Sequence, residues 1–149
     1  MSDAIDDATA ITNLLYVYAE AMDAGDFEAA ASLFEHALLI VADGVPPIDS
    51  ATMLAIWREN VITYDDGTPR TRHVVTNPIV EVDEGASTAR CRSVYTVFQQ
   101  ADDGALTPIV SGRYHDDFAK LDGTWRFARR DYSLVDLVGD VSRHLRMEL

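Results

Sequence analysis

Apolar residues recur at three- and four-residue spacings over roughly the first sixty positions, which is the pattern of amphipathic helices. One such stripe covers residues 4–24. Gly25 predicts the end of that helix, because glycine is favoured just beyond a helix C-terminus. Asp26 then predicts the N-cap of a short second helix over residues 27–34. The pattern therefore indicates two consecutive helices at the start of the chain.

A short apolar run over residues 37–42 follows, and it predicts a strand that is buried on both faces. The Gly-Val-Pro-Pro segment at 44–47 interrupts this run. Asp49 or Ser50 predicts the cap of a third helix, which continues to about Ile62 with one apolar face.

After residue 69 apolar and polar residues alternate, which predicts β-strands. Four strands are expected, over residues 70–83, 87–100, 106–120 and 124–134. The short connections between them contain Gly beside Asp or Glu, a strong hairpin signal. Helices followed by such strands predict an α+β fold, with three N-terminal helices packed on an antiparallel or mixed sheet. Because long strands twist and coil, we expect a strongly curved, cone-shaped sheet with an interior pocket.

The length of 149 residues predicts a single domain, 1–149, and an apolar content of 48% is enough for a packed core. The net charge of −13 argues against nucleic acid as a partner, because phosphates require a basic surface. The apolar runs are too short to cross a membrane, and early aspartates do not fit an export signal. The single cysteine, Cys91, is typical of a reducing compartment, so we expect a cytoplasmic protein.

No sequence motif indicates a bound cofactor. The chain has no P-loop, no G-x-G-x-x-G segment and no paired CxxC. His115, Asp116 and Asp117 could suggest a metal site, but neighbouring residues on a strand point to opposite faces. We therefore expect neither a cofactor nor a metal ion.

The candidate chemistry centres on the segment between Pro69 and Pro78, which is rich in β-branched residues and reads as a strand. Because side chains alternate along a strand, His73, Val75 and Asn77 are expected on one face. An imidazole and an amide beside a valine indicate either a partly polar pocket or an unusual solvent-facing surface.

Four segments together resemble the SnoaL-like branch of the nuclear-transport-factor-2-like superfamily. They are residues 14–27 (LLYVYAEAMDAGDF), 71–77 (TRHVVTN), 112–114 (GRY) and 122–127 (DGTWRF). The resemblance extends over nearly the whole chain and implies a single α+β barrel domain. It implies no single activity, because this superfamily includes dehydratases, isomerases, cyclases and pure binding proteins on one scaffold.

Within that superfamily the chemical likeness is to lyases of the scytalone dehydratase, bile-acid 7α-dehydratase and hexachlorocyclohexane dehydrochlorinase type. The resemblance implies that His73 is a general base and that Asp23 orients it. Tyr18 matches a tyrosine of the bile-acid enzymes and would act as an acid or oxyanion donor. A carboxylate bound to one imidazole nitrogen fixes the tautomer and leaves the other nitrogen free to accept a proton.

Each of these residues also has an ordinary structural interpretation. His73 could be a core histidine, Asp23 could simply end a helix, and Tyr18 lies on the apolar stripe of its helix. Tyr18 and Asp23 are five residues apart, about 140° around an ideal helix. Both can face one cavity only if the helix unwinds near Gly25.

Further residues are predicted to line the pocket and contact a ligand: Asn77, Trp57, Tyr95, Gln99 and Tyr114. Gln99 lies where the scytalone enzyme has a second histidine, so the fungal pigment substrate is not implied. Tyr114 is expected to point inward, with Arg113 in an ion pair on the outer face. His36 and His144 have no partner visible in the sequence and are expected at the surface.

These observations predict a cofactor-independent lyase or isomerase of the dehydratase type, acting on a small hydrophobic molecule that carries a hydroxyl or carbonyl group, such as a steroid or polyketide. Two alternatives stay open. One is a polyketide cyclase in which Asp23 itself removes the proton, and the other is a non-catalytic ligand-binding or assembly module. A large curved sheet of this kind usually pairs with another copy, so we expect a homodimer or homotrimer.

Overall fold

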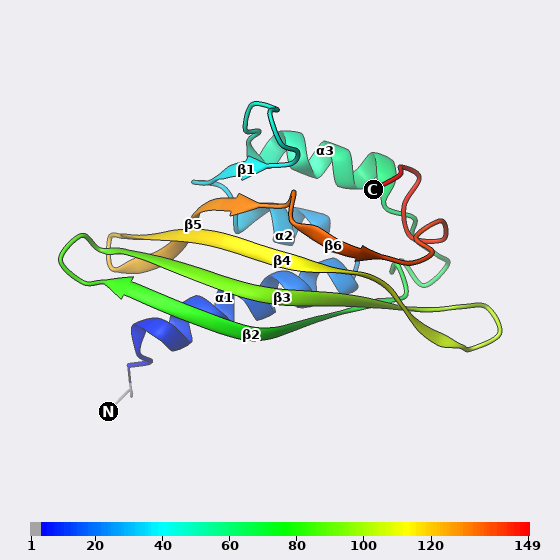
Figure 1. The fold of residues 1–149 in the computed structure, drawn as a ribbon, viewed down its shortest axis with the longest axis horizontal. Helices are drawn as coiled ribbons and strands as arrows, with labels where there is room; N and C mark the ends of the chain where they lie inside the picture. Colours follow the sequence, from blue (N-terminus) through cyan, green and yellow to red (C-terminus); the bar gives the residue numbers. More distant parts are fainter. Residues whose placement is uncertain (1–3) are drawn as a thin grey trace.

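The computed structural model describes residues 4–149, and the helices and strands follow the order expected for an α+β fold (Figure 1). The helices are α1 (Asp7–Asp23), α2 (Phe27–Ser32) and α3 (Ser50–Asn60). The strands are β1 (Leu38–Ile40), β2 (Thr71–Asp83), β3 (Thr88–Gln100), β4 (Leu106–Leu121), β5 (Thr124–Asp131) and β6 (Val135–Val138). The predicted fold class is thereby confirmed.

The three helices begin where aspartates provide a cap. The carboxylates at positions 6, 26 and 49 each accept the backbone N–H three residues further on, at 2.7 to 3.1 Å. α1 ends at Asp23, and Gly25 adopts the left-handed conformation with φ of 73°. A Cβ atom at Gly25 would collide with the carbonyl oxygen of Gly67, so glycine allows the loop before β2 to pack against the end of α1.

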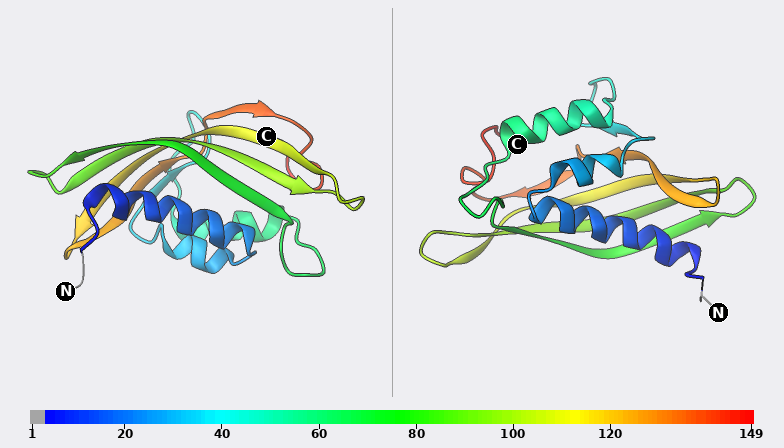
Figure 2. Two further views of the ribbon diagram at one scale, coloured as in Figure 1. Left: turned by 90° about the horizontal axis from the view of Figure 1, so that it is seen from below. Right: turned by 180° about the vertical axis from the view of Figure 1, so that it is seen from behind.

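The strands form one six-stranded sheet in the order β1-β5-β4-β3-β2, with β6 paired to β4. β1 runs parallel to β5 and the other pairs are antiparallel, so the sheet is mixed. The sheet curves over the helices, which all lie on its concave side (Figure 2). It is not closed into a barrel, because β1 and β2 are separate edges. The expectation of a barrel was wrong in this respect.

Two further strand predictions require correction. The apolar run 37–42 yields only the three-residue β1, which is buried on one face: Leu39 is fully buried, whereas Leu38 is 56% exposed. The predicted last strand over 124–134 ends earlier, at Asp131, as β5. A further strand that was not predicted, β6, follows and pairs with a different part of β4.

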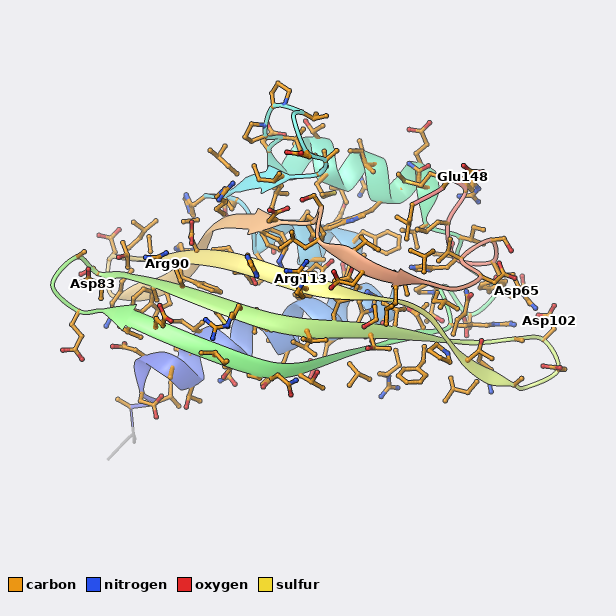
Figure 3. All side chains as sticks on the ribbon, in the orientation of Figure 1. Asp65, Asp83, Arg90, Asp102, Arg113 and Glu148 are labelled. Atoms are coloured by element: carbon orange, nitrogen blue, oxygen red, sulfur yellow. The ribbon has the colours of Figure 1, made fainter. Side chains whose placement is uncertain are left out.

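The core lies between the helices and the concave face of the sheet, where the aromatic side chains gather. Charged side chains lie on the sheet and on the loops around it: Figure 3 labels Arg90 and Arg113 on strands, Asp83 and Asp102 at hairpin ends, and Asp65 and Glu148 outside the sheet. Arg113 pairs with Asp136 at 2.9 Å, on the side expected from the strand alternation. Among the described residues, no helix is long and apolar enough to cross a membrane.

Candidate functional site

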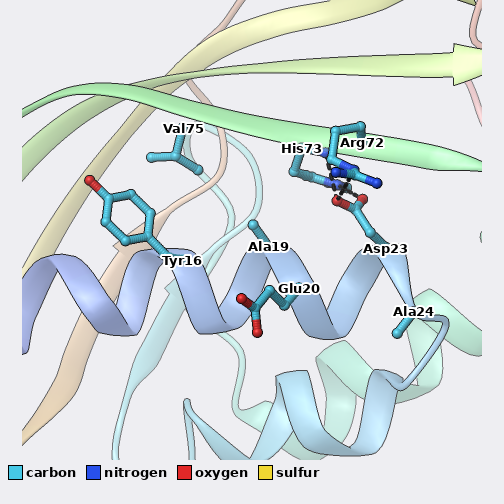
Figure 4. Close-up of a pocket in the computed structure, with 8 residues that line it drawn as sticks. All are labelled: Tyr16, Ala19, Glu20, Asp23, Ala24, Arg72, His73 and Val75. Carbon is cyan, nitrogen blue, oxygen red and sulfur yellow. Dashed lines mark hydrogen bonds and ion pairs between the residues drawn. The ribbon is translucent and has the colours of Figure 1, made fainter.

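His73 on β2 and Asp23 at the end of α1 are in direct contact (Figure 4). The Nδ1 atom of His73 lies 2.5 Å from Oδ1 of Asp23. Both side chains are largely buried, with exposed fractions of 7% for His73 and 13% for Asp23. The carboxylate therefore holds the imidazole by one nitrogen and leaves Nε2 for another partner.

The edge position of β2 explains why this contact forms. An edge strand presents backbone N–H groups that no neighbouring strand accepts. Here the N–H of His73 donates to Oδ2 of Asp23 at 2.8 Å, and the hydroxyl of Thr71 donates to Oδ1 at 3.0 Å. The carboxylate is thus fixed by three groups of β2, while Arg72 Nε lies 3.9 Å away on the solvent side.

This arrangement removes the angular conflict between Tyr18 and Asp23. α1 stays helical to Asp23, so the two side chains do leave the helix in different directions. Tyr18 points into the interior, whereas Asp23 reaches the edge of β2 and contacts the cavity only through His73. Asp23 borders a groove on the outer side of this edge, together with Tyr16 and Glu20 (Figure 4).

An interior cavity of about 380 Å³ lies between the concave face of the sheet and helices α1 and α3. Apolar and aromatic side chains form most of its lining, and His73, His144, Asn60 and four tyrosines contribute polar atoms. The tyrosines are Tyr18, Tyr95, Tyr114 and Tyr132. None of the described lining residues is Asp, Glu, Lys or Arg. Such a concave, mostly apolar site with a few polar groups suits a small organic molecule.

Tyr18 is buried and faces this cavity, and the hydroxyl of Tyr132 donates to the Tyr18 hydroxyl at 3.1 Å. With its oxygen already accepting, the Tyr18 hydroxyl has its own proton to donate. Burial raises the pKa of Tyr18, and the nearby charge of Arg130 opposes this effect. Tyr18 is therefore protonated and a hydrogen-bond donor at neutral pH.

Trp57, Tyr95 and Tyr114 also line the cavity, as the sequence predicted. Tyr95 and Tyr114 stack with their ring centroids 4.4 Å apart. This stacking depends on Gly112, which lies directly opposite Tyr95 on the neighbouring strand. A Cβ atom at Gly112 would be 2.7 Å from the Tyr95 hydroxyl and 2.5 Å from the carbonyl oxygen of Leu134.

The structure does not place Asn77 in the cavity. A β-bulge interrupts the pairing of β2 with β3 between Thr76 and Ile79, so the alternation that began at His73 is broken before Asn77. Asn77 adopts φ of 54° and is exposed. Asparagine tolerates this left-handed conformation better than most residues do, so the backbone conformation alone explains an asparagine at this position.

Gln99 is buried, but its side-chain amide binds backbone carbonyl groups and does not line the cavity. Its Nε2 donates to the carbonyl oxygens of Pro69 at 3.2 Å and of Arg143 at 3.0 Å. Gln99 therefore ties the entry to β2 and the C-terminal segment to the end of β3, in contrast with the predicted ligand contact.

His144 was expected at the surface, yet it is buried and lines the cavity with His73. Its backbone N–H donates to the carbonyl of Val141, and its own carbonyl accepts from Ile62, so the C-terminal segment folds back beneath α3. Burial lowers the pKa of His144 to about 4, and the neighbouring His73 acts in the same direction. The one sequence signal for this placement was a pair of flanking apolar residues, Val141 and Leu145.

The sequence also gave no indication that Arg130 is completely buried. Its guanidinium donates to both carboxylate oxygens of Asp116, at 2.7 and 2.9 Å. Burial raises the pKa of the Asp116 carboxyl, while the contact with Arg130 acts in the opposite sense. The guanidinium carbon lies 3.8 Å from the centre of the Tyr114 ring and 4.5 Å from that of Tyr18, behind the cavity wall.

Residues 3–131 match the model of the SnoaL-like domain, and the chain belongs to this family. The match ends before Tyr132 and His144. No curated protein matches the chain significantly.

Solved structures share the fold of this chain. A protein of unknown function from Mycobacterium tuberculosis, Rv3472, is 27% identical, with a TM-score of 0.67 over 87% of this chain and 72% of that one. Two proteins from Novosphingobium aromaticivorans are also similar. One is an NTF2-like protein with a cystatin-like fold, at 22% identity and a TM-score of 0.66 over 92% and 86% of the two chains. The other is a candidate scytalone dehydratase, at 20% identity and 0.62 over 94% of each chain.

Proposed function

We propose that this protein is a cofactor-independent lyase or isomerase that uses His73 as a general base on a small, mostly apolar substrate bearing a hydroxyl or carbonyl group. The observation that carries the proposal is the contact between His73 Nδ1 and Asp23 Oδ1 at the wall of an aromatic cavity. With the Nδ1 proton donated to the carboxylate, Nε2 carries the lone pair that accepts a proton from the substrate.

The proposed reaction begins with removal of a proton from the carbon next to a carbonyl group. Nε2 of His73 takes this proton, the electron pair of the broken C–H bond forms a double bond to the carbonyl carbon, and the π pair of the carbonyl moves to its oxygen, which gives an enolate. In a dehydration the carbonyl then re-forms, the double bond shifts to the α and β carbons, and the bond from the β carbon to its hydroxyl group breaks; the leaving oxygen takes a proton to depart as water. In this proposal Tyr18 donates that proton or stabilises the oxyanion, and its protonated hydroxyl and its position at the same cavity support this role.

The geometry gives less support to the cyclase alternative, in which Asp23 would remove the substrate proton itself. The Asp23 carboxylate is engaged by Thr71 and by two groups of His73, and it does not border the interior cavity. A binding or assembly module without catalysis needs no ordered histidine–carboxylate pair at its ligand.

Formation of a homodimer or homotrimer stays a prediction; the exposed Val74 and Ile79 on β2 are consistent with it.

Exchange of carbon-bound protons tests the proposal without knowledge of the natural leaving group. The α-protons of 2-tetralone, an apolar ketone, are followed by proton NMR in deuterated buffer. We expect exchange above the buffer rate with the protein, and a loss of about 100-fold or more of the protein-dependent rate in His73→Ala. Asp23→Asn should lose a smaller part, because the base remains but its orientation is relaxed.

His36→Ala and Asp43→Asn provide matched controls, because both residues are exposed and lie outside the site. They should exchange protons at the wild-type rate. An equal rate in wild type and His73→Ala would rule out His73 as the base and leave the binding module as the better interpretation.

A further inference from the structure

His144 combines deep burial with an unused hydrogen-bonding atom. The residue is only 6% exposed, and its Nδ1 has no hydrogen-bond partner among residues 4–149. The backbone around His144 is fixed by hydrogen bonds. The N–H of His144 donates to the carbonyl of Val141, and the N–H of Ile62 donates to the carbonyl of His144. The next residue, Leu145, forms a β-bridge with Val61. The ring is therefore held at the cavity wall by its surroundings.

Unsatisfied polar atoms in a protein interior are uncommon, because each one loses its hydrogen bonds to water without replacement. Two other buried polar atoms, Ser93 Oγ and Arg130 Nη1, also lack a partner among the described residues, but neither residue lines the cavity. His144 differs from them because its side chain lines the cavity. The groups that face His144 here are His73, with Asp23 behind it, and the tyrosines of the cavity. In this setting the imidazole stays neutral above a pH of about 4, so it has one donor and one acceptor.

We propose that His144 is a second ligand-contact residue, and that the cavity recognises an uncharged ring molecule through two oxygen functions, one at His73 and one at His144. This inference rests on the proposed function for the role of His73, and it adds the substrate class. It also explains the lining: without a cationic side chain among the described lining residues, a carboxylate or phosphate would enter the cavity without compensation.

Binding of a small series of ketones tests the inference independently of catalysis. The probes are 2-tetralone, which has one oxygen, and its 5-, 6- and 7-hydroxy derivatives, which place a second oxygen at different distances. Affinities are measured by isothermal titration calorimetry at pH 7.5. We expect at least one hydroxy derivative to bind about tenfold more tightly than 2-tetralone, which is the effect of one good hydrogen bond.

In the variant His144→Phe the ratio of the affinities for the hydroxy derivative and for 2-tetralone should fall from about ten to about one. His36→Phe, the same change at an exposed histidine, should keep the preference. The inference is overturned if no hydroxy derivative is preferred by the wild type, or if the preference survives in His144→Phe. It is also overturned if 2-naphthoate binds more tightly than 2-naphthol, because the cavity would then select an anion.

A stability measurement separates a ligand contact from a structural role. An aromatic side chain of similar size at position 144 removes an unsatisfied polar atom, so ligand-free His144→Phe should melt at the same temperature as the wild type or a few degrees higher. A melting temperature several degrees lower would indicate that His144 supports the fold and would contradict the proposal. If proton exchange is absent but the binding preference depends on His144, the proposed catalysis fails while this inference stands.

Discussion

The two ends of the aromatic interior differ in what surrounds their polar side chains. At one end Arg130 forms a two-point ion pair with Asp116, and five aromatic rings lie within 5.5 Å of its guanidinium carbon. At the other end His73 and His144 face a cavity, and neither Nε2 of His73 nor Nδ1 of His144 has a protein partner among the described residues. Tyr18, Tyr114 and Tyr132 separate the two ends.

This contrast shows how one hydrophobic core can provide both support and a binding site. At the end around Arg130 two opposite charges compensate each other among aromatic rings, although Nη1 of Arg130 has no hydrogen-bond partner among residues 4–149. The end around the histidines is hollow and keeps hydrogen-bonding capacity for a ligand, which reduces stability in the absence of that ligand.

The largest expected effect is the loss of Arg130. Arg130→Met leaves the carboxylate of Asp116 buried without a counterion, and we expect a loss of about 3–5 kcal/mol in the free energy of unfolding. Chemical denaturation measures this loss. The double variant Arg130→Met with Asp116→Leu should recover much of it, because no buried charge remains. A loss below about 1 kcal/mol in the single variant would show that the end around Arg130 is not the rigid support inferred from the contacts.

The hollow end predicts a specific dependence of stability on pH. His144 has a pKa of about 4 in the folded protein and an ordinary value of 6.5 when unfolded. Between these values the unfolded chain binds a proton that the folded protein does not, so stability is fully present above pH 6.5 and decreases as the pH falls toward 4. The full effect is about 3 kcal/mol, from 1.36 kcal/mol for each pH unit.

His144→Phe should lack this contribution, so the difference in unfolding free energy between the two proteins should widen from pH 7 to pH 4.5. Surface aspartates with lowered pKa, such as Asp49 and Asp66, titrate at lower pH and affect both proteins equally. Parallel stability curves for the two proteins between pH 7 and 4.5 would show that the pKa of His144 is not lowered in the folded protein, and would contradict this prediction.

The smallest expected effect concerns the wall between the two ends. Gly112→Ala places a Cβ atom against Tyr95 and the carbonyl of Leu134, and overpacking of this kind costs about 1–3 kcal/mol. Displacement of Tyr95 should also disturb its stacking on Tyr114 and weaken binding of 2-tetralone. Gly104→Ala is a control for the loss of a glycine, because nothing lies near its Cβ position, although its φ of 86° carries a backbone cost of its own. Wild-type affinity in Gly112→Ala would show that Tyr95 does not shape the cavity.

Residue pattern alone determined the order of the helices and most of the strands. Aspartate caps, Gly25 and the Asp-Gly turn at 122–123 act on neighbouring residues, so their effects are visible locally. The pairing of His73 with Asp23 was anticipated from the family resemblance and not from the pattern. The structure brings these two side chains together, while their roles in catalysis stay proposals.

Only the tertiary structure decided the remaining features of the site. The bulge that turns Asn77 outward, the use of Gln99 by two backbone carbonyls, and the burial of Arg130 all depend on segments distant in the sequence. His144 is the clearest case, because its cavity position is created by backbone contacts between the C-terminal segment and the end of α3. Local patterns specify which element forms, because they act within a few residues. Packing between segments that are distant in the sequence decides which polar groups line the same cavity, so local sequence patterns do not predict it.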